Sequence, residues 1–240
     1  MIFSPRLSRR KMLGGLLSGY AAISGLVKGA PLTFAAELGA SGQGMRSKGR
    51  PLTLLVLGDS LTAGYGLPLS ESFPSQLEAA LQQRGHAIRV INAGVSGDTT
   101  ADGLARLDWV LGEPFDAAIV ELGANDALRG LPPTLAQENL RQILTRLRQP
   151  SRPILLAGMM APRNLGADYG RAFDALYPAL AKEFSCRLYP FFLEGVIGGP
   201  TGLLQSDGLH PTKAGVARIV TGILPEVEAL LQDLPRVSQE

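Results

Sequence analysis

Two short segments far apart in the sequence carry side chains that together could activate a nucleophile. Ser60 lies in the string Gly58-Asp59-Ser60-Leu61, which follows a short apolar run. A serine at such a strand-to-helix transition can project its hydroxyl into a crevice. A serine hydroxyl is a weak nucleophile near neutral pH and needs a base within hydrogen-bond distance. Histidine suits that task because its ordinary pKa is about 6.5, and the chain contains only two histidines.

His210 is the better placed of these two histidines. It lies in a turn before the last predicted helix, with Asp207 three residues earlier. A carboxylate at this spacing can accept a hydrogen bond from one ring nitrogen and leave the other nitrogen to accept the serine proton. His86 lies in a turn at the opposite edge of the predicted sheet and is expected at the surface. Taken alone, Ser60 would more often be a helix cap, and Asp207 could equally belong to a helix-entry turn.

Acyl transfer also needs donors for the negative charge that develops on the substrate oxygen. Three groups could supply them: the backbone N–H of Gly94, which has no side chain to block a close approach, the side-chain amide of Asn125, and the backbone N–H of Ser60. Taken separately, Gly94 and Asn125 could each be ordinary turn residues.

The elements that must position these residues alternate between strands and helices. Short apolar runs predict four buried strands, at 52–57, 88–91, 117–122 and 154–157, and helical spacing predicts helices over 73–83 and 135–147. This alternation predicts an α/β fold, a doubly wound three-layer sandwich around a mainly parallel, flavodoxin-like sheet. Ligands bind such sheets beyond the carboxyl ends of the strands, where the candidate residues lie.

The first 36 residues have the composition of an export signal. They carry no acidic residue, several small and apolar residues, and the basic residues Arg6, Arg9, Arg10, Lys11 and Lys28. The stretch 8–13 resembles a twin-arginine motif, which we favour over ordinary export. The uncharged stretch that follows is shorter than the roughly 20 apolar residues of a spanning helix, so no stable membrane span is expected. We expect an exported, periplasmic protein.

The remaining chain divides into three parts. Residues 37–50 are polar and rich in glycine and predict a flexible tether, residues 51–232 form the catalytic domain, and residues 233–240 form a tail. Removal of the signal makes the net charge negative, so nucleic-acid binding loses its support in the composition. A sole cysteine, Cys186, excludes an intramolecular disulfide, and two histidines exclude a multi-histidine metal site. We expect no metal and no cofactor.

Taken together, the blocks Gly58-Asp59-Ser60-Leu61, Gly94, Gly123-Ala124-Asn125-Asp126 and Asp207-Gly208-Leu209-His210 resemble those of the SGNH (GDSL) hydrolases. Longer strings, such as 57–66 and 96–99, resemble the bacterial thioesterase I, lysophospholipase and arylesterase group over nearly all of 51–231. Ala124 departs from that group, in which a second glycine often stands.

The resemblance implies Ser60 as nucleophile, His210 as base, Asp207 as its partner, and an oxyanion hole of Ser60, Gly94 and Asn125. It further implies substrate contacts at Asp59 and Leu61 and, in a loop that could cover an acyl chain, at Leu165 and Gly166. The resemblance implies small esters, thioesters or lysophospholipids as substrates, and we expect a monomer. A carbohydrate deacetylase or sugar-ester esterase on the same scaffold is the alternative, less favoured because aromatic residues are scarce in these loops.

Overall fold

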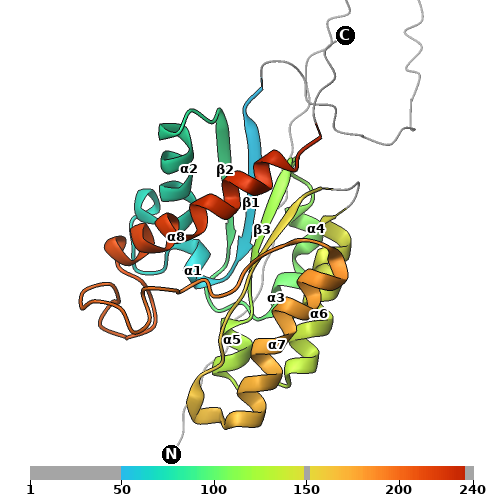
Figure 1. Cartoon of the computed structure of the whole chain (residues 1–240), viewed down its shortest axis with the longest axis vertical. Coiled ribbons are helices and arrows are strands. Elements are labelled where there is room, and N and C mark those ends of the chain that lie inside the picture. The colour runs from blue at the N-terminus through green and yellow to red at the C-terminus, as the bar shows by residue number, and fades with distance from the viewer. Residues whose placement is uncertain (1–49, 149–151, 236–240) are drawn as a thin grey trace, which may run out of the picture. The chain divides into compact units, whose positions relative to one another are not determined.

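The computed structural model describes residues 50–148 and 152–235 (Figure 1). The predicted signal (1–36), the tether (37–50) apart from its last residue, and residues 236–240 of the predicted tail lie outside the described residues. The described part begins its first strand at Leu52 and ends its last helix at Gln232. No helix within it is both long and apolar enough to cross a membrane.

One five-stranded sheet in the order β2-β1-β3-β4-β5 forms the centre of the domain, and all its strand pairs are parallel. Its strands are β1 (Leu52–Gly58), β2 (Ile88–Gly94), β3 (Ala117–Glu121), β4 (Ile154–Ala157) and β5 (Arg187–Tyr189). This strand order is that of flavodoxin-like doubly wound sheets, so the predicted fold class is confirmed.

Helices cover both faces of the sheet (Figure 1). On one face α2 packs against β2 and α8, and on the other α6 packs against α3 and α7. The helices are α1 (Ser60–Ala63), α2 (Phe73–Gln83), α3 (Thr100–Ala105), α4 (Leu107–Val110), α5 (Ala124–Leu128), α6 (Pro133–Leu147), α7 (Ala167–Phe184) and α8 (Lys213–Gln232), with short 3-10 turns η1 (Leu69–Glu71) and η2 (Arg163–Leu165).

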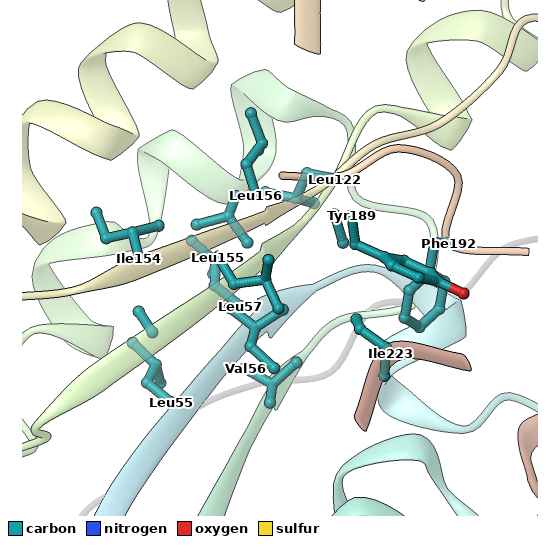
Figure 2. Close-up of a cluster of buried hydrophobic side chains, with 14 of the residues drawn as sticks. Leu55, Val56, Leu57, Leu122, Ile154, Leu155, Leu156, Tyr189, Phe192 and Ile223 are labelled. Atoms are coloured by element: carbon teal, nitrogen blue, oxygen red, sulfur yellow. The ribbon is translucent and has the colours of Figure 1, made fainter. Parts of the chain in front are cut away.

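The central strands are apolar along their whole length because helices cover them on both sides. β3 and β4 are buried at every position, and β1 at every position but its first. Figure 2 shows side chains of β1 and β4 packed with residues from β5, the following loop and α8, including Tyr189, Phe192 and Ile223. This core holds fixed the strand ends from which the polar loops emerge.

Sequence periodicity located the buried elements well and missed one edge strand, β5. The helix predicted over 73–83 has those bounds, and the helix predicted over 135–147 begins at Pro133. The second strand continues to Gly94 rather than ending at Ile91. β5 was not predicted, because it has three residues, two of them only half-buried, and so it lacks the continuous apolar run of a central strand.

Helix α8 presses its first turn against the segment that carries His210. A Cβ placed on Gly215 would overlap the carbonyl oxygen of Leu203, a rigid backbone atom, whereas one on Gly170 in α7 would first meet, at 3.4 Å, the flexible end of Arg163. The two helical glycines therefore differ in what an alanine would encounter.

We expect Gly215→Ala to lower the free energy of unfolding by about 1–3 kcal/mol through overpacking. We expect Gly170→Ala to be neutral or to raise it by up to about 1 kcal/mol, because alanine favours helix over glycine. Urea unfolding of both variants measures the two effects. Equal shifts in the same direction would show that contact with Leu203 does not restrict Gly215.

Candidate active site

Ser60 is held at the carboxyl end of β1 by a tight turn. Asp59 caps α1, its side chain accepting the backbone N–H of Leu61 at 3.0 Å, and Gly64 ends the helix in the left-handed conformation with φ of 83°. The side chain of Ser60 retains 9% exposure, whereas Asp59 is fully buried. The serine therefore starts a four-residue helix directly above the sheet.

The structure brings Ser60, His210 and Asp207 together in one line of hydrogen bonds. His210 Nε2 lies 2.9 Å from Ser60 Oγ, and its Nδ1 lies 2.6 Å from Asp207 Oδ2. These contacts correspond to an imidazole with the proton on Nδ1 and a free electron pair on Nε2 facing the serine. The three side chains come from two segments separated by 150 positions in the sequence.

Asp207 is fixed by the backbone of its own loop. Its Oδ1 accepts the N–H groups of Leu209 at 2.9 Å and His210 at 3.0 Å, and Gly208 permits the turn with φ of 70°. The hydrogen bond with the His210 ring and these two backbone bonds lower the pKa of Asp207 to about 2. Asp207 is therefore an anion throughout the neutral range.

Gln205 joins the histidine loop to the turn after the nucleophile. Its Nε2 donates to the carbonyl of Tyr65 at 2.8 Å and to that of Pro211 at 2.9 Å, and its backbone N–H donates to the carbonyl of His210 at 2.8 Å. The ring of Tyr65 packs on His210 with centroids 4.5 Å apart. The imidazole is thus held from the side as well as by its own two nitrogens.

Asn125 lies in α5, whose preceding turn requires Gly123. The φ of Gly123 is 120°, and a Cβ there would overlap the hydroxyl of Tyr177. Asn125 Nδ2 donates to the carbonyl of Asp98 at 2.9 Å and to Asp59 Oδ2 at 3.3 Å. This amide therefore faces the start of α1, on the side expected of an oxyanion donor.

The expected role of Gly94 as an oxyanion donor needs correction. Its N–H donates to Asn92 Oδ1 at 3.0 Å, and a Cβ there would overlap the backbone nitrogen of Ala63. Gly94 therefore lets α1 lie against β2 and has no free N–H to offer. Spacing in the sequence does not show that a neighbouring side chain captures this donor.

Gly97, which sequence reasoning did not single out, carries a backbone N–H that could serve as a donor in place of that of Gly94. It has a φ of 90° in the exposed loop after β2, next to the Asp98 carbonyl that holds Asn125, and its N–H has no acceptor among residues 50–148 and 152–235. The signal was present in the Ser96-Gly97-Asp98 string, where glycine precedes the aspartate of a turn.

Asp59 and Leu61 were expected to contact substrate, and their side chains do not line the site. Asp59 is fully buried under the nucleophile, and Leu61 is 6% exposed and belongs to the hydrophobic core. Burial raises the pKa of Asp59 to about 7, partly offset by the bond from Leu61 N–H and the charge of His210. Side chains on either side of an outward-facing residue can point inward, which explains the error.

The loop residues Leu165 and Gly166 lie at the end of η2 and the start of α7. Leu165 is half-buried, and its side chain lies near Gly130, just beyond α5: a Cβ added to Gly130 would be 4.0 Å from Leu165 Cδ2. Their contact with substrate stays a prediction. His86 lies away from this site, as expected from its turn. Its Nε2 is 3.4 Å from Oε1 of Glu228 in α8.

Hydrogen bonds from charged side chains link the strand ends and loops beneath the site. Arg106 donates from Nη2 to the carbonyls of Gly58 and Ala93, at 3.0 and 2.8 Å, and from Nε to Asp98 at 2.6 Å. On the neighbouring loop, the side chain of Asp126 accepts both the N–H and the hydroxyl of Thr100. In the part of the chain that the structure describes, no three His, Cys, Asp or Glu side chains are grouped so as to hold a metal ion.

Several known proteins are similar to this chain in sequence. The family model of the GDSL-like lipase/acylhydrolases matches residues 56–218. The chain is 43% identical to the esterase TesA of Pseudomonas aeruginosa over 180 residues, 75% of this chain and 89% of that protein. It is 41% identical to thioesterase 1/protease 1/lysophospholipase L1 of Escherichia coli over 180 residues, 75% of this chain and 85% of that protein.

A solved structure is similar over the whole domain. The crystal structure of AlinE4, an SGNH-hydrolase family esterase, is 49% identical in sequence, with a TM-score of 0.65 over 79% of this chain and 100% of that chain. The family match spans the segments that carry Ser60, Asn125, Asp207 and His210. The chain therefore belongs to the GDSL-like lipase/acylhydrolase family.

Proposed function

We propose that the chain hydrolyses carboxylic esters and thioesters through an acyl-enzyme on Ser60. The observation that carries this proposal is the unbroken line of hydrogen bonds from Asp207 Oδ2 through both nitrogens of His210 to Ser60 Oγ. Asp207 selects the tautomer in which Nε2 can take a proton, and it stabilises the imidazolium that forms when Nε2 takes it.

Catalysis then proceeds in two halves. Ser60 Oγ attacks the carbonyl carbon while His210 Nε2 takes the hydroxyl proton, and the leaving alcohol or thiol departs with that proton. Water enters next and loses a proton to the same nitrogen as it attacks the acyl-enzyme. Ser60 regains its proton and the carboxylic acid is released.

Three donors suit the developing oxyanion: the N–H groups of Ser60 and Gly97 and the amide of Asn125. The Ser60 N–H is free because the first turn of a helix leaves its N–H groups unpaired. Of the two bonds made by Asn125 Nδ2, the longer one to Asp59 is the one that an oxyanion would replace. A preorganised donor of this kind is worth roughly 3–4 kcal/mol in the transition state.

The surface around the site favours an acyl or aryl substrate over a sugar ester. Exposed apolar side chains come from α5 and from several loops beyond the carboxyl ends of the strands: Tyr65, Val95, Leu128, Met160 and Leu209. Sugar sites usually stack rings on tryptophan or tyrosine, but Tyr65 already packs on His210. Trp109 is on α4, which precedes the amino end of β3.

The names of the relatives agree with such substrates. TesA is called an esterase, and the Escherichia coli protein a thioesterase and lysophospholipase. An apolar rim accommodates the acyl chains of all three substrate types, because the hydrophobic effect does not distinguish the leaving groups. Leu165 and Gly166, on the far side of the loop after β4, are the proposed acyl-chain contacts.

The main test is hydrolysis of p-nitrophenyl esters from acetate to palmitate by the parent and Ser60→Ala. We expect the parent to prefer chains longer than acetate and Ser60→Ala to lose essentially all turnover, because Ser60 Oγ is the hydroxyl that lies 2.9 Å from His210 Nε2. A fluorophosphonate should label the parent on Ser60 and leave the variant unlabelled.

Two results would change the proposal. Cleavage of acetate alone would favour the deacetylase alternative. Undiminished turnover by Ser60→Ala would show that another residue is the nucleophile.

Asp207→Asn tests the orienting role. The asparagine amide can donate to Nδ1 and favour the tautomer with the proton on Nε2, so we expect kcat to fall by roughly a thousandfold or more. KM should change little because Asp207 does not contact substrate in the proposed mechanism. Asp233→Asn, which removes the charge of another acid paired with a basic side chain, is the control and should leave kcat unchanged. A parental kcat in Asp207→Asn would exclude the proposed role.

We further propose that the protein is exported to the periplasm and that its N-terminal segment is removed. The proposal rests on the basic start and uncharged stretch of residues 1–36. We expect fractionation of the expressing cells to place the protein outside the cytoplasm, with a new N-terminus near Glu37 by mass spectrometry. Replacement of both Arg9 and Arg10 by lysine should retain it inside. Cytoplasmic protein with an intact N-terminus would contradict export.

A further inference from the structure

A buried acid lies beneath the nucleophile and takes no part in the proposed chemistry. Glu121 ends β3 and is the register partner of Gly58 on β1. Its side chain is fully buried, and Oε2 accepts the hydroxyl of Thr62 at 2.7 Å. Its Oε1 has no hydrogen-bond partner within the described residues. An ionised carboxylate in this state would be costly, so the presence of an acid here calls for an explanation.

The space that Glu121 occupies exists because Gly58 has no side chain. A Cβ on Gly58 would overlap the Thr62 hydroxyl and lie 2.7 Å from Glu121 Oε2. The glutamate therefore passes under the end of β1 and reaches the third residue of α1, the helix that Ser60 starts. One hydrogen bond thus links β3 to the element that carries the nucleophile.

We propose that Glu121, as an uncharged carboxylic acid, is a positioning residue that holds Thr62 and thereby keeps Ser60 Oγ within reach of His210. The inference rests on the proposed function, because it assigns a supporting role in the same site. Glu121 also precedes the Leu122-Gly123 turn that leads into α5 and Asn125. The same residue therefore couples the nucleophile to the proposed oxyanion donor.

The surroundings of Glu121 favour its uncharged form. Burial raises its pKa well above the ordinary value, and the charge of Asp59 raises the pKa further, whereas the Thr62 hydroxyl and the backbone N–H groups of Asp59 and Thr62 lower it. In the uncharged form the unpartnered Oε1 carries a smaller desolvation penalty than it would on a carboxylate.

Acidic groups outnumber basic ones on the elements packed around this pair. Arg106 is a nearby cation, and its hydrogen bonds go to the carbonyls of Gly58 and Ala93 and to Asp98 rather than to Glu121. The other titratable groups that face Glu121 and Asp59 are Asp98 in the loop after β2, Asp126 in α5, Tyr177 in α7 and His210 beyond the serine. A second carboxylate charge is therefore disfavoured here.

The experiment compares Glu121→Ala, Glu121→Gln and the exposed control Glu113→Gln in the full-length chain. Fluorophosphonate titration counts the active sites, so kcat is obtained per labelled serine. We expect Glu121→Ala to lose roughly ten- to a hundredfold in kcat with little change in KM, because small displacements of a reacting group are costly. Glutamine mimics the neutral acid and should stay within about threefold of the parent, as should the control.

Each outcome decides between separate statements. An unlabelled, inactive parent would overturn the proposed function itself. An active parent with an unchanged kcat per site in Glu121→Ala would overturn the positioning role alone. A loss in Glu121→Gln as large as in Glu121→Ala would overturn the claim that the acid acts uncharged.

Thr62→Val and Thr62→Ser provide a second pair if Glu121→Ala does not fold. Valine keeps the shape of threonine and removes the hydroxyl, whereas serine keeps the hydroxyl. We expect kcat per site to fall in Thr62→Val and to be largely retained in Thr62→Ser. Equal values in the two variants would overturn the role of this hydrogen bond.

The pH dependence of stability supplies a readout independent of activity. An acid whose pKa is higher in the folded than in the unfolded protein contributes its full stabilisation of the folded state below the unfolded pKa, which is about 4.3 for glutamate. That contribution is lost as the pH rises through the folded-state pKa. We therefore expect the Tm difference, Glu121→Gln minus parent, to increase in favour of the variant from pH 5 to pH 8. A difference that does not grow with pH would show that the acid is not held in its neutral form.

Discussion

At the carboxyl end of β1, three segments approach so closely that no side chain fits at Gly58. The parallel register places Gly58 beside Gly94 on one strand and Glu121 on the other, and α1 lies directly above. Thr62 and Glu121 take the side-chain space at Gly58, and the backbone of Ala63 takes it at Gly94. The position of Ser60 is therefore set by the ends of three strands, which the buried core holds in register. A site on such a rigid base needs little reorganisation during catalysis.

The parts of the fold and site that the sequence could predict are those governed by periodicity or short spacing. Helix α2 follows its apolar stripe, and Asp207 lies in hydrogen-bond contact with His210 because three residues suffice to form the turn. β5 was missed because a three-residue edge strand carries too few apolar positions to show a period. The donor role of Gly94 was misjudged because Asn92 captures its N–H, a contact that depends on a side-chain rotamer.

The buried acid Asp59, directly beneath the site, affects the charge that forms on His210 during catalysis. Asp59 is buried, and its pKa is raised to about 7 by burial, while the charge of His210 acts in the opposite direction. By reciprocity, a negative charge on Asp59 favours a positive imidazole. The proposed mechanism creates such a positive charge on His210 when it takes the serine proton. When Asp59 is ionised, its charge therefore stabilises this transition state through space, without contact with the substrate.

The base and its orienting acid lie within four positions of each other in one loop. Asp207 is bonded to two backbone N–H groups of that loop, and Gln205 ties it to the turn after α1. The pair is therefore a preformed unit, and within the Asp207–His210–Ser60 line the separation between the imidazole and the serine is the one that the rest of the domain must maintain. Such modularity allows the surrounding loops to diverge widely in length and sequence, and new substrate preferences can arise without rebuilding the proton relay.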